Sequence, residues 1–176
     1  MKEKYYIEIK VTNGAKIRLC LETKYAPITV ENFVKLVEQN YFDGTIFHRV
    51  IHNFMIQTGG YAVVDNSLTE MPEVTPIEGE FASNGHPENT LHHELGVISM
   101  ARTSDKNSGS SQFFLCSADC GWLDGEYAAF GYAIDEESKK AIVEISEVET
   151  CRPHPAFADF PVEVIGVESI RLIDGE

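Results

Sequence analysis

Hydrophobic and polar residues alternate along the first part of the chain. Residues 5–11 and 15–21 both place apolar side chains at every second position, a period typical of strands with one buried face. The dipeptide Asn13-Gly14 lies between the two runs and favours a tight turn. The pattern therefore predicts that a β-hairpin comes first.

Apolar residues recur at helical spacing in two other segments. The first begins near Pro27 and Thr29, and its apolar face carries Val30, Phe33, Val34 and Val37. The second covers 138–148 and turns inward Ala141, Ile142, Ile145 and Val148. Charged residues occupy the other positions of both segments, as in helices that pack one face on a core. The sequence therefore predicts two helices, one early and one late.

Turn residues divide the rest of the chain into short apolar segments. Strands are predicted at 46–51, 54–57, 97–101, 113–117, 128–134 and 162–173. Proline, glycine and polar residues predict loops at 61–94, 103–111 and 151–161, with a candidate short strand at 78–81. A loop as long as 61–94 is uncommon in a compact domain and is often functional. Roughly eight strands in all favour a closed antiparallel β-barrel or a sandwich, in a single domain over residues 1–176.

Composition narrows the classes of partner and compartment. The chain has 14 Lys and Arg against 28 Asp and Glu, a formal net charge of −14. This charge argues against binding nucleic acid or an anionic membrane, because both attract cationic proteins. No segment has the ~20 consecutive apolar residues of a membrane span, and the first residues lack the apolar core of a signal peptide. We therefore expect a cytoplasmic protein, with Cys20, Cys116, Cys120 and Cys151 as reduced thiols.

Common catalytic motifs are missing from the sequence. It contains no Gly-x-Ser-x-Gly elbow, no phosphate-binding Gly-x-x-x-x-Gly-Lys and no His-Glu-x-x-His. Two histidine groups, His48 with His52 and His86 with His92 and His93, are the only hint of a metal. Neither has an obvious carboxylate or thiolate to complete a ligand set. No metal and no cofactor are therefore expected.

Arg49 is the most unusual residue of the predicted strands. Strand alternation places it on one face with Phe47 and Ile51, while His48 and Val50 take the other. An arginine among large apolar residues is costly to bury without a partner. Spacing alone leaves open whether Arg49 lies at a barrel rim in solvent or in a functional groove.

Phe114 and Trp122 raise the same question, since each could be part of the core or of an exposed wall. Trp122 stands beside the turn Asp124-Gly125, where partial exposure is expected. An apolar wall beside an arginine and two glutamines would form a peptide-binding groove.

Several short motifs, taken together, resemble the cyclophilins, especially bacterial members. They arrive in family order and span about half of the chain: FDGTIFHRVI at 42–51, FMIQ at 54–57, GVISMA at 96–101, SQFF at 111–114, WLDG at 122–125 and FG at 130–131. The resemblance implies an eight-stranded closed antiparallel β-barrel capped by two α-helices. It also implies peptidyl-prolyl cis/trans isomerase activity in a groove on the outer face of the barrel.

The resemblance also assigns roles to individual residues. Arg49 matches the family's catalytic arginine, and Gln57 the glutamine beside it. The apolar pocket for the proline ring corresponds to Phe54, Met55, Phe114 and Leu123. Positions that contact the peptide or help to bind cyclosporin correspond to Ala101, Gln112 and Trp122.

The sequence departs from the best-known eukaryotic pattern at the edge of this groove. Arg102-Thr103 stands where Asn-Ala is usual, and Tyr127 where a histidine is usual. We count all three as substrate-binding positions, and expect the changes to alter substrate preference and cyclosporin affinity more than catalysis. The expected partners are proline-containing peptides and folding proteins, bound by a monomer.

Two other classes of function remain as alternatives. A proline-peptide binding module or chaperone-like protein would keep Phe54, Phe114 and Trp122 but could dispense with Arg49. A metal-binding or hydrolytic protein would need the histidine groups. The presence of both Arg49 and Gln57 favours the enzyme.

Overall fold

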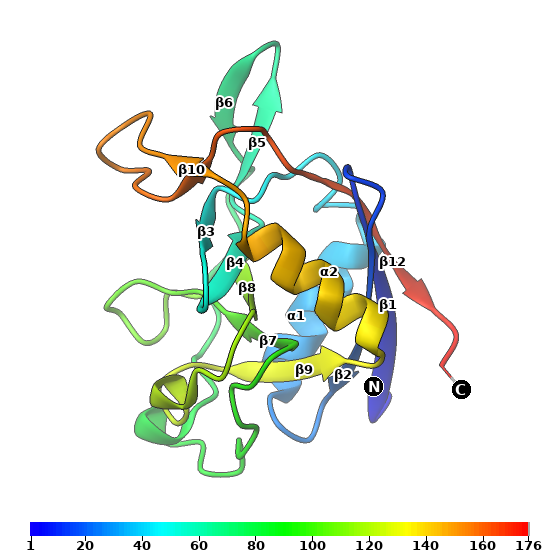
Figure 1. Ribbon diagram of the computed structural model, residues 1–176. Helices are drawn as coiled ribbons and strands as arrows, with labels where there is room; N and C mark the ends of the chain where they lie inside the picture. Colours follow the sequence, from blue (N-terminus) through cyan, green and yellow to red (C-terminus); the bar gives the residue numbers. More distant parts are fainter. Residues whose placement is uncertain (176) are drawn as a thin grey trace.

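One antiparallel sheet of eight strands dominates the computed structural model, which describes residues 1–175 (Figure 1). The strand order is β12-β1-β2-β9-β7-β8-β4-β3. The strands are β1 (Lys4–Val11), β2 (Lys16–Glu22), β3 (Arg49–Ile51), β4 (Met55–Thr58), β7 (Val97–Met100), β8 (Phe113–Cys116), β9 (Ala129–Ala133) and β12 (Val167–Ile173). This mainly β architecture confirms the predicted fold class.

The sheet curls into a barrel, but its two edge strands do not pair with each other in a ladder. Single backbone hydrogen bonds bring the edges together instead. Phe47 N–H donates to the Ile165 carbonyl at 2.9 Å, and Gly44 N–H donates to the Val167 carbonyl at 2.8 Å. The predicted closure is therefore made by irregular segments beside β3 and β12.

Two helices lie at the openings of the barrel, with α2 (Glu136–Ser146) in front and α1 (Pro27–Glu38) behind in Figure 1. Both contribute buried side chains to one core, including Phe33 from α1 and Ile142 from α2. The rings of Phe33, Phe42, Phe113 and Phe130 pack there with centroids 5.1 to 5.4 Å apart. The lumen is therefore filled by side chains, and a binding site has to lie on the outer face.

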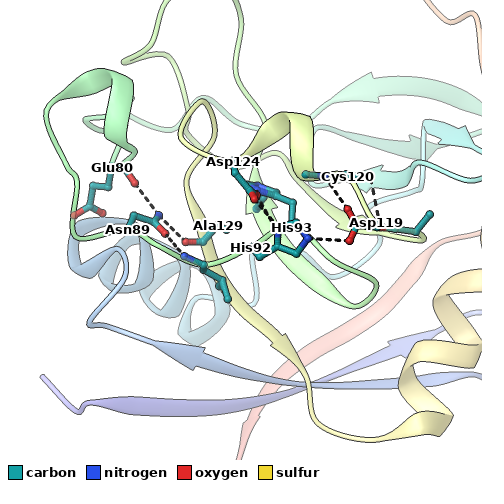
Figure 2. Close-up of polar contacts among 12 residues, drawn as sticks. Glu80, Asn89, His92, His93, Asp119, Cys120, Asp124 and Ala129 are labelled. Atoms are coloured by element: carbon teal, nitrogen blue, oxygen red, sulfur yellow. Dashed lines mark hydrogen bonds and ion pairs between the residues drawn. The ribbon is translucent and has the colours of Figure 1, made fainter.

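A buried carboxylate joins the long segment before β7 to helix α1. Glu80 Oε1 accepts hydrogen bonds from the backbone N–H of Thr29 at 2.6 Å and from its hydroxyl at 2.7 Å. Ala26, the cap residue of α1, gives no side-chain hydrogen bond, so Glu80 satisfies a free N–H of the first turn in its place. Asn89 holds the same segment by donating to the carbonyls of Glu80 and Ala129 at 2.8 and 2.9 Å (Figure 2).

Several predicted boundaries were wrong, chiefly in the loops. The region predicted as loop 61–94 contains a hairpin, β5 (Tyr61–Val64) with β6 (Ser67–Glu70), and a 3₁₀ turn, η1 (Ala82–Asn84), while 78–81 is not a strand. The predicted loop 151–161 overlaps the small ladder of β10 (Thr150–Cys151) and β11 (Phe160–Pro161). The last strand begins at Val167 instead of 162, and α2 ends at Ser146.

The strand predicted at 46–51 is also shorter than expected. Regular pairing begins only at Arg49, because residues 47 and 48 are irregular. Phe47 is therefore in the core, 1% exposed, and does not share a face with the exposed Arg49. Among residues 1–175, no helix is long and apolar enough to cross a membrane.

Candidate functional site

The outer face of three neighbouring strands brings together Arg49, Gln57 and Phe114. Arg49 of β3 pairs with Gln57 of β4, and Gln57 pairs with Phe114 of β8. Residues directly opposite each other in a sheet point to the same face. The next row of the same strands, Val50, Ile56 and Leu115, is 0–1% exposed and faces the core. The alternation therefore directs the first row outward, onto the groove.

A pocket of about 150 Å³, with both apolar and polar side chains in its walls, lies next to this row. It is lined by Arg49, Phe54, Met55, Gln57, Ala101, Arg102, Phe114, Leu123 and Tyr127. Phe114 forms its floor at 5% exposed, and Tyr127 meets the Phe114 ring edge-on with centroids 5.8 Å apart. Nine of the predicted site residues therefore come together, from four separate parts of the chain. The pocket can take one compact apolar ring beside a guanidinium.

Polar side chains connect Arg49 to the far side of the groove. Arg49 Nη1 donates to Gln57 Oε1 at 3.3 Å, and Gln57 Nε2 donates to Gln112 Oε1 at 2.8 Å. A side chain at position 60 would collide with Gln112, so Gly60 leaves the space that Gln112 occupies. Gln112 does not line the pocket itself. Its position lets it fix Gln57, and through Gln57 the guanidinium of Arg49.

Trp122 lies at the outer edge of the pocket and not inside it. It is 64% exposed and is carried by the 3₁₀ turn η2 (Gly121–Leu123). Its ring lies 5.6 Å from that of Phe54. The two aromatic rings therefore form a wall open to solvent, and the expected exposure of Trp122 is confirmed.

Arg102 and Thr103 differ in their placement. The guanidinium of Arg102 stacks on Tyr127 at 4.5 Å and on Phe81 at 5.0 Å, and it donates twice to the Glu126 carbonyl, at 2.8 and 3.1 Å. Arg102 is thus part of the pocket wall. Thr103 lies outside the pocket, where its backbone N–H and its hydroxyl both bond to Ser108 Oγ at 2.9 Å.

Two buried histidines lie behind the groove, and sequence reasoning did not place either of them there. His93 is 1% exposed, and its ring stacks on Phe114 with centroids 6.2 Å apart. Its nitrogens contact Asp124 Oδ1 at 2.8 Å and Ser99 Oγ at 2.9 Å. Burial lowers the pKa of His93, so the ring that supports the pocket floor is neutral at pH 7.

His48 occupies an aromatic environment beside Arg49. The rings of Tyr61 and Phe157 lie 4.8 and 6.3 Å away. Burial, with a smaller contribution from the charge of Arg49, lowers the pKa of His48 to about 4. At neutral pH His48 is therefore uncharged, and of His48 and Arg49 only Arg49 carries a positive charge at this edge of the groove. Only the alternation of strand residues hinted that His48 would point away from the groove.

The histidine groups do not form a metal site in the described part of the chain. Residues 1–175 contain no group of three or more His, Cys, Asp or Glu side chains placed to hold a metal ion. His86 instead contacts Glu78 at 2.6 Å and Glu88 at 3.1 Å. The aspartates that contact His92 and His93 come from a different and later part of the sequence.

Comparison with known sequences gives a consistent match. The model of the family "Cyclophilin type peptidyl-prolyl cis-trans isomerase/CLD" matches residues 6–171. The chain is 38% identical over 165 residues to peptidyl-prolyl cis-trans isomerase A of Dickeya dadantii, with 92% of this chain and 82% of the relative covered. It is 36% identical over 167 residues to a peptidyl-prolyl cis-trans isomerase of Acinetobacter baylyi, covering 92% and 84%.

Comparison with solved structures gives the same fold. A cyclophilin-type peptidyl-prolyl cis-trans isomerase of Cryptosporidium parvum superposes with a TM-score of 0.76 at 23% identity, over 98% of this chain and 99% of that one. The same parasite protein in the presence of the dipeptide Ala-Pro gives a TM-score of 0.74 at 24% identity, covering 97% and 99%. At this identity the likeness concerns the fold.

Proposed function

The chain belongs to the cyclophilin-type peptidyl-prolyl cis-trans isomerase family, and from this premise we propose that it accelerates rotation about X-Pro bonds through Arg49 and the apolar pocket. The observation that carries the mechanism is the row Arg49–Gln57–Phe114, which sets one guanidinium beside a ring-sized pocket. The pocket would take the proline ring, and Arg49 would act on the bond that precedes it.

The chemistry required is the removal of a rotational barrier. Resonance gives the peptide bond double-bond character and a barrier of ~18–20 kcal/mol, and uncatalysed X-Pro exchange takes roughly tens to hundreds of seconds. In the twisted transition state this resonance is lost, so the prolyl nitrogen becomes pyramidal and its lone pair accepts a hydrogen bond. A donor at this atom binds the transition state more tightly than the ground state, which is the condition for catalysis.

The neighbours of Arg49 support this proposed role. Its guanidinium is exposed to the groove, and Gln57 accepts one of its N–H groups. A planar guanidinium has five N–H donors, so others stay available to substrate. Gln57 and Gln112 would restrict the rotamers of Arg49 before substrate arrives, which lowers the entropy lost on reaching the transition state. Rotation breaks no covalent bond, so the mechanism involves neither a nucleophile nor a general base.

The pocket supplies the second half of the proposal. Met55, Phe114 and Leu123 are at most 7% exposed, and packing fixes such side chains in defined rotamers. They would hold the proline ring while the acyl side turns. An NMR exchange measurement on an Ala-Pro peptide, which needs no protease, tests the proposal. Native protein at micromolar concentration should speed exchange well above the thermal rate, and Phe114→Ala should abolish most of the effect. No acceleration on several X-Pro peptides would leave only the binding-module alternative.

The same groove supports a proposal about cyclosporin. The rings of Trp122 and Phe54 form an exposed apolar wall at the pocket edge, so the drug should bind and change the fluorescence of the chain's single tryptophan. Arg102 and Tyr127 line the pocket where eukaryotic members usually carry other residues, so we expect weaker binding than in a typical eukaryotic member. A flat titration to high micromolar drug would contradict the role of Trp122.

Cytoplasmic localisation is likewise proposed. Cys20, Cys116, Cys120 and Cys151 are all free thiols in the described structure, and three of them are buried. Free thiols are typical of reducing compartments. Localising a tagged chain in its native host by cell fractionation would test this.

A further inference from the structure

Behind the wall of the pocket, two histidines and two aspartates contact one another. Figure 2 shows His92 and His93 side by side next to Asp124, with Asp119 beyond them. His92 Nδ1 contacts Asp124 Oδ2, and His92 Nε2 contacts Asp119 Oδ2 at 2.8 Å. Asp124 Oδ1 accepts from the backbone N–H of His93 at 2.7 Å and contacts its Nδ1 at 2.8 Å. We refer to these four residues as the clamp.

The clamp connects the segment before β7 to the turn that carries the pocket wall. Asp119 and Asp124 stand on either side of η2, which holds Trp122 and Leu123. The His92 ring packs on the backbone of this turn, since a Cβ at Gly121 would lie 3.0 Å from His92 Cε1. The Cys120 N–H also donates to the His93 carbonyl at 2.7 Å. His92 therefore fastens both ends of the turn to one anchor.

The two histidines carry different charges. A neutral imidazole has one donor and one acceptor nitrogen, whereas both nitrogens of His92 face carboxylate oxygens and must both donate. His92 is therefore an imidazolium, and hydrogen bonds to Asp119 and Asp124 raise its pKa to about 9. His93 satisfies its two nitrogens with one carboxylate and one hydroxyl, so it bonds fully as the neutral ring.

We propose that His92 is a positioning residue of the isomerase: its imidazolium ties Asp119 to Asp124 and thereby holds Trp122 and Leu123 in place as one wall of the substrate pocket. This inference rests on the proposed function. His92 lies outside the set of residues that line the pocket and acts through Leu123 and Trp122. Its loss should weaken the binding of substrate much more than it slows the rotation, because the side-chain hydrogen bond that orients Arg49 joins it to Gln57 and not to the clamp.

Other groups near His92 could give a pH response of their own. Asp119 and Asp124 contact it directly, His93 contacts the same Asp124, and the Cys120 thiol lies at the start of the turn. Hydrogen bonding to Cys116 lowers the pKa of Cys120, so this thiol is a second titratable group on the turn. Asp119 and Asp124 have pKa values below their usual range and stay ionised from neutral to alkaline pH. A variant at position 92 separates His92 from the thiol.

His86 provides a matched control. It is also a histidine between two carboxylates, Glu78 and Glu88, with a raised pKa. It lies outside the pocket wall, so His86→Gln removes the same kind of ion pair without touching the turn η2. Its peptide affinity and pH profile should follow those of the native protein.

The experiment measures peptide binding by Trp122 fluorescence, and KM and kcat by NMR exchange, from pH 7 to pH 10. In the native protein and in His86→Gln, Kd and KM should rise at least ~3-fold with a midpoint near the pKa of about 9, while kcat changes less than ~2-fold. His92→Gln should show the weaker binding already at pH 7 and no alkaline step. His92→Arg, whose charge persists at these pH values, should restore tight binding and keep it to pH 10.

A step that persists in His92→Gln, or a loss confined to kcat, would overturn the inference. The binding arm does not require turnover. If the native protein bound peptide but failed to accelerate exchange at pH 7, the proposed function would fail while the Kd values still decided the role of His92.

Discussion

Tyr127 and Arg102 show how the contacts of single residues shape the wall of the pocket. Tyr127 stands edge-on to Phe114, and the Arg102 guanidinium stacks on the outer face of Tyr127 and holds the preceding carbonyl. A stacked guanidinium stabilises a ring position by about 0.5–1 kcal/mol at an exposed site, and by more where water is excluded. Arg102 therefore supports the pocket wall, a role that its position in a motif does not reveal.

Arg102→Ala should consequently raise KM for an Ala-Pro peptide by ~3- to 10-fold, with kcat within ~2-fold of native. Arg102→Lys should recover little, because a lysine cannot stack on Tyr127 and donate twice to the Glu126 carbonyl. The split between KM and kcat is read from NMR exchange at several peptide concentrations. A selective fall in kcat would instead place Arg102 in the chemistry.

The contacts of single side chains were the least predictable part of the site. Sequence motifs identified Arg49, Gln57 and Phe114, because these residue types recur in fixed short runs. The link from Arg49 through Gln57 to Gln112 depends on the register of β4 against β8, which no short run contains. The same holds for His92, whose partners Asp119 and Asp124 come 27 and 32 residues later.

Whole elements were more predictable where one face is buried. The bounds of β1, β2 and α1 were predicted to within a few residues. Each of these elements packs one face on the core, so its apolar residues follow the period of a strand or a helix. The hairpin β5–β6 was missed because Val63, Val64 and Leu68 are 40–52% exposed and follow no inward pattern. Its turn residues Asp65 and Asn66 both have positive φ. Asp and Asn tolerate this conformation better than most residues, so the pair Asp65-Asn66 was the sequence signal for a hairpin.

Helix α1 and the segment before β7 depend on each other through Glu80. This carboxylate is 1% exposed and accepts both donors of Thr29. Glu80→Ala would leave these donors buried and unpaired, which costs about 1–3 kcal/mol. For a chain of this length 1 kcal/mol corresponds to roughly 2–4 °C.

We therefore expect Glu80→Ala to lower the melting temperature by roughly 3–10 °C, measured by thermal unfolding monitored with circular dichroism. Glu73→Ala removes an exposed carboxylate from the same segment and should change the melting temperature by less than ~1 °C. Equal effects of the two substitutions would show that Glu80 does not anchor the segment.

At the scale of the whole molecule, the filled lumen decides where function can lie. Four phenylalanine rings occupy the barrel interior, so peptide has access only to the outer face of β3, β4 and β8. The pattern of apolar residues could not predict that the lumen is filled, because each strand buries one face in a β-sandwich as well as in a β-barrel. The closure by isolated backbone hydrogen bonds near Phe47 and Gly44 was equally beyond pattern analysis.

Buried neutral histidine also sets how the stability of the molecule varies with pH. The folded pKa of His48 is about 4, below the ~6.5 of an unfolded chain. Its contribution is fully present above pH 6.5 and is lost as the pH falls toward 4, because only the unfolded state takes up the proton. Between pH 7 and pH 5 the loss is about 2 kcal/mol.

His48→Phe keeps an aromatic ring among Tyr61 and Phe157 and removes the titrating group. The free energy of unfolding is measured by urea titration at pH 7 and at pH 5. Its decrease between the two pH values should be about 2 kcal/mol smaller in His48→Phe than in the native protein. His52→Phe, at an exposed position, should retain the native pH dependence. Identical pH dependence in His48→Phe and native protein would contradict the burial of a neutral His48.

The most direct test of the account replaces Arg49 with lysine. Lysine keeps the positive charge but exchanges a rigid planar fork for one flexible ammonium. If Arg49 donates to the prolyl nitrogen of the twisted bond, kcat/KM measured by NMR exchange should fall at least ~10-fold, or about 1.4 kcal/mol. Binding of a proline peptide should weaken by no more than ~3-fold, since ground-state contacts lie in the apolar pocket. The melting temperature should stay native, because Arg49 is exposed. Equal losses in affinity and rate, or a large loss of thermal stability, would contradict the catalytic role of Arg49.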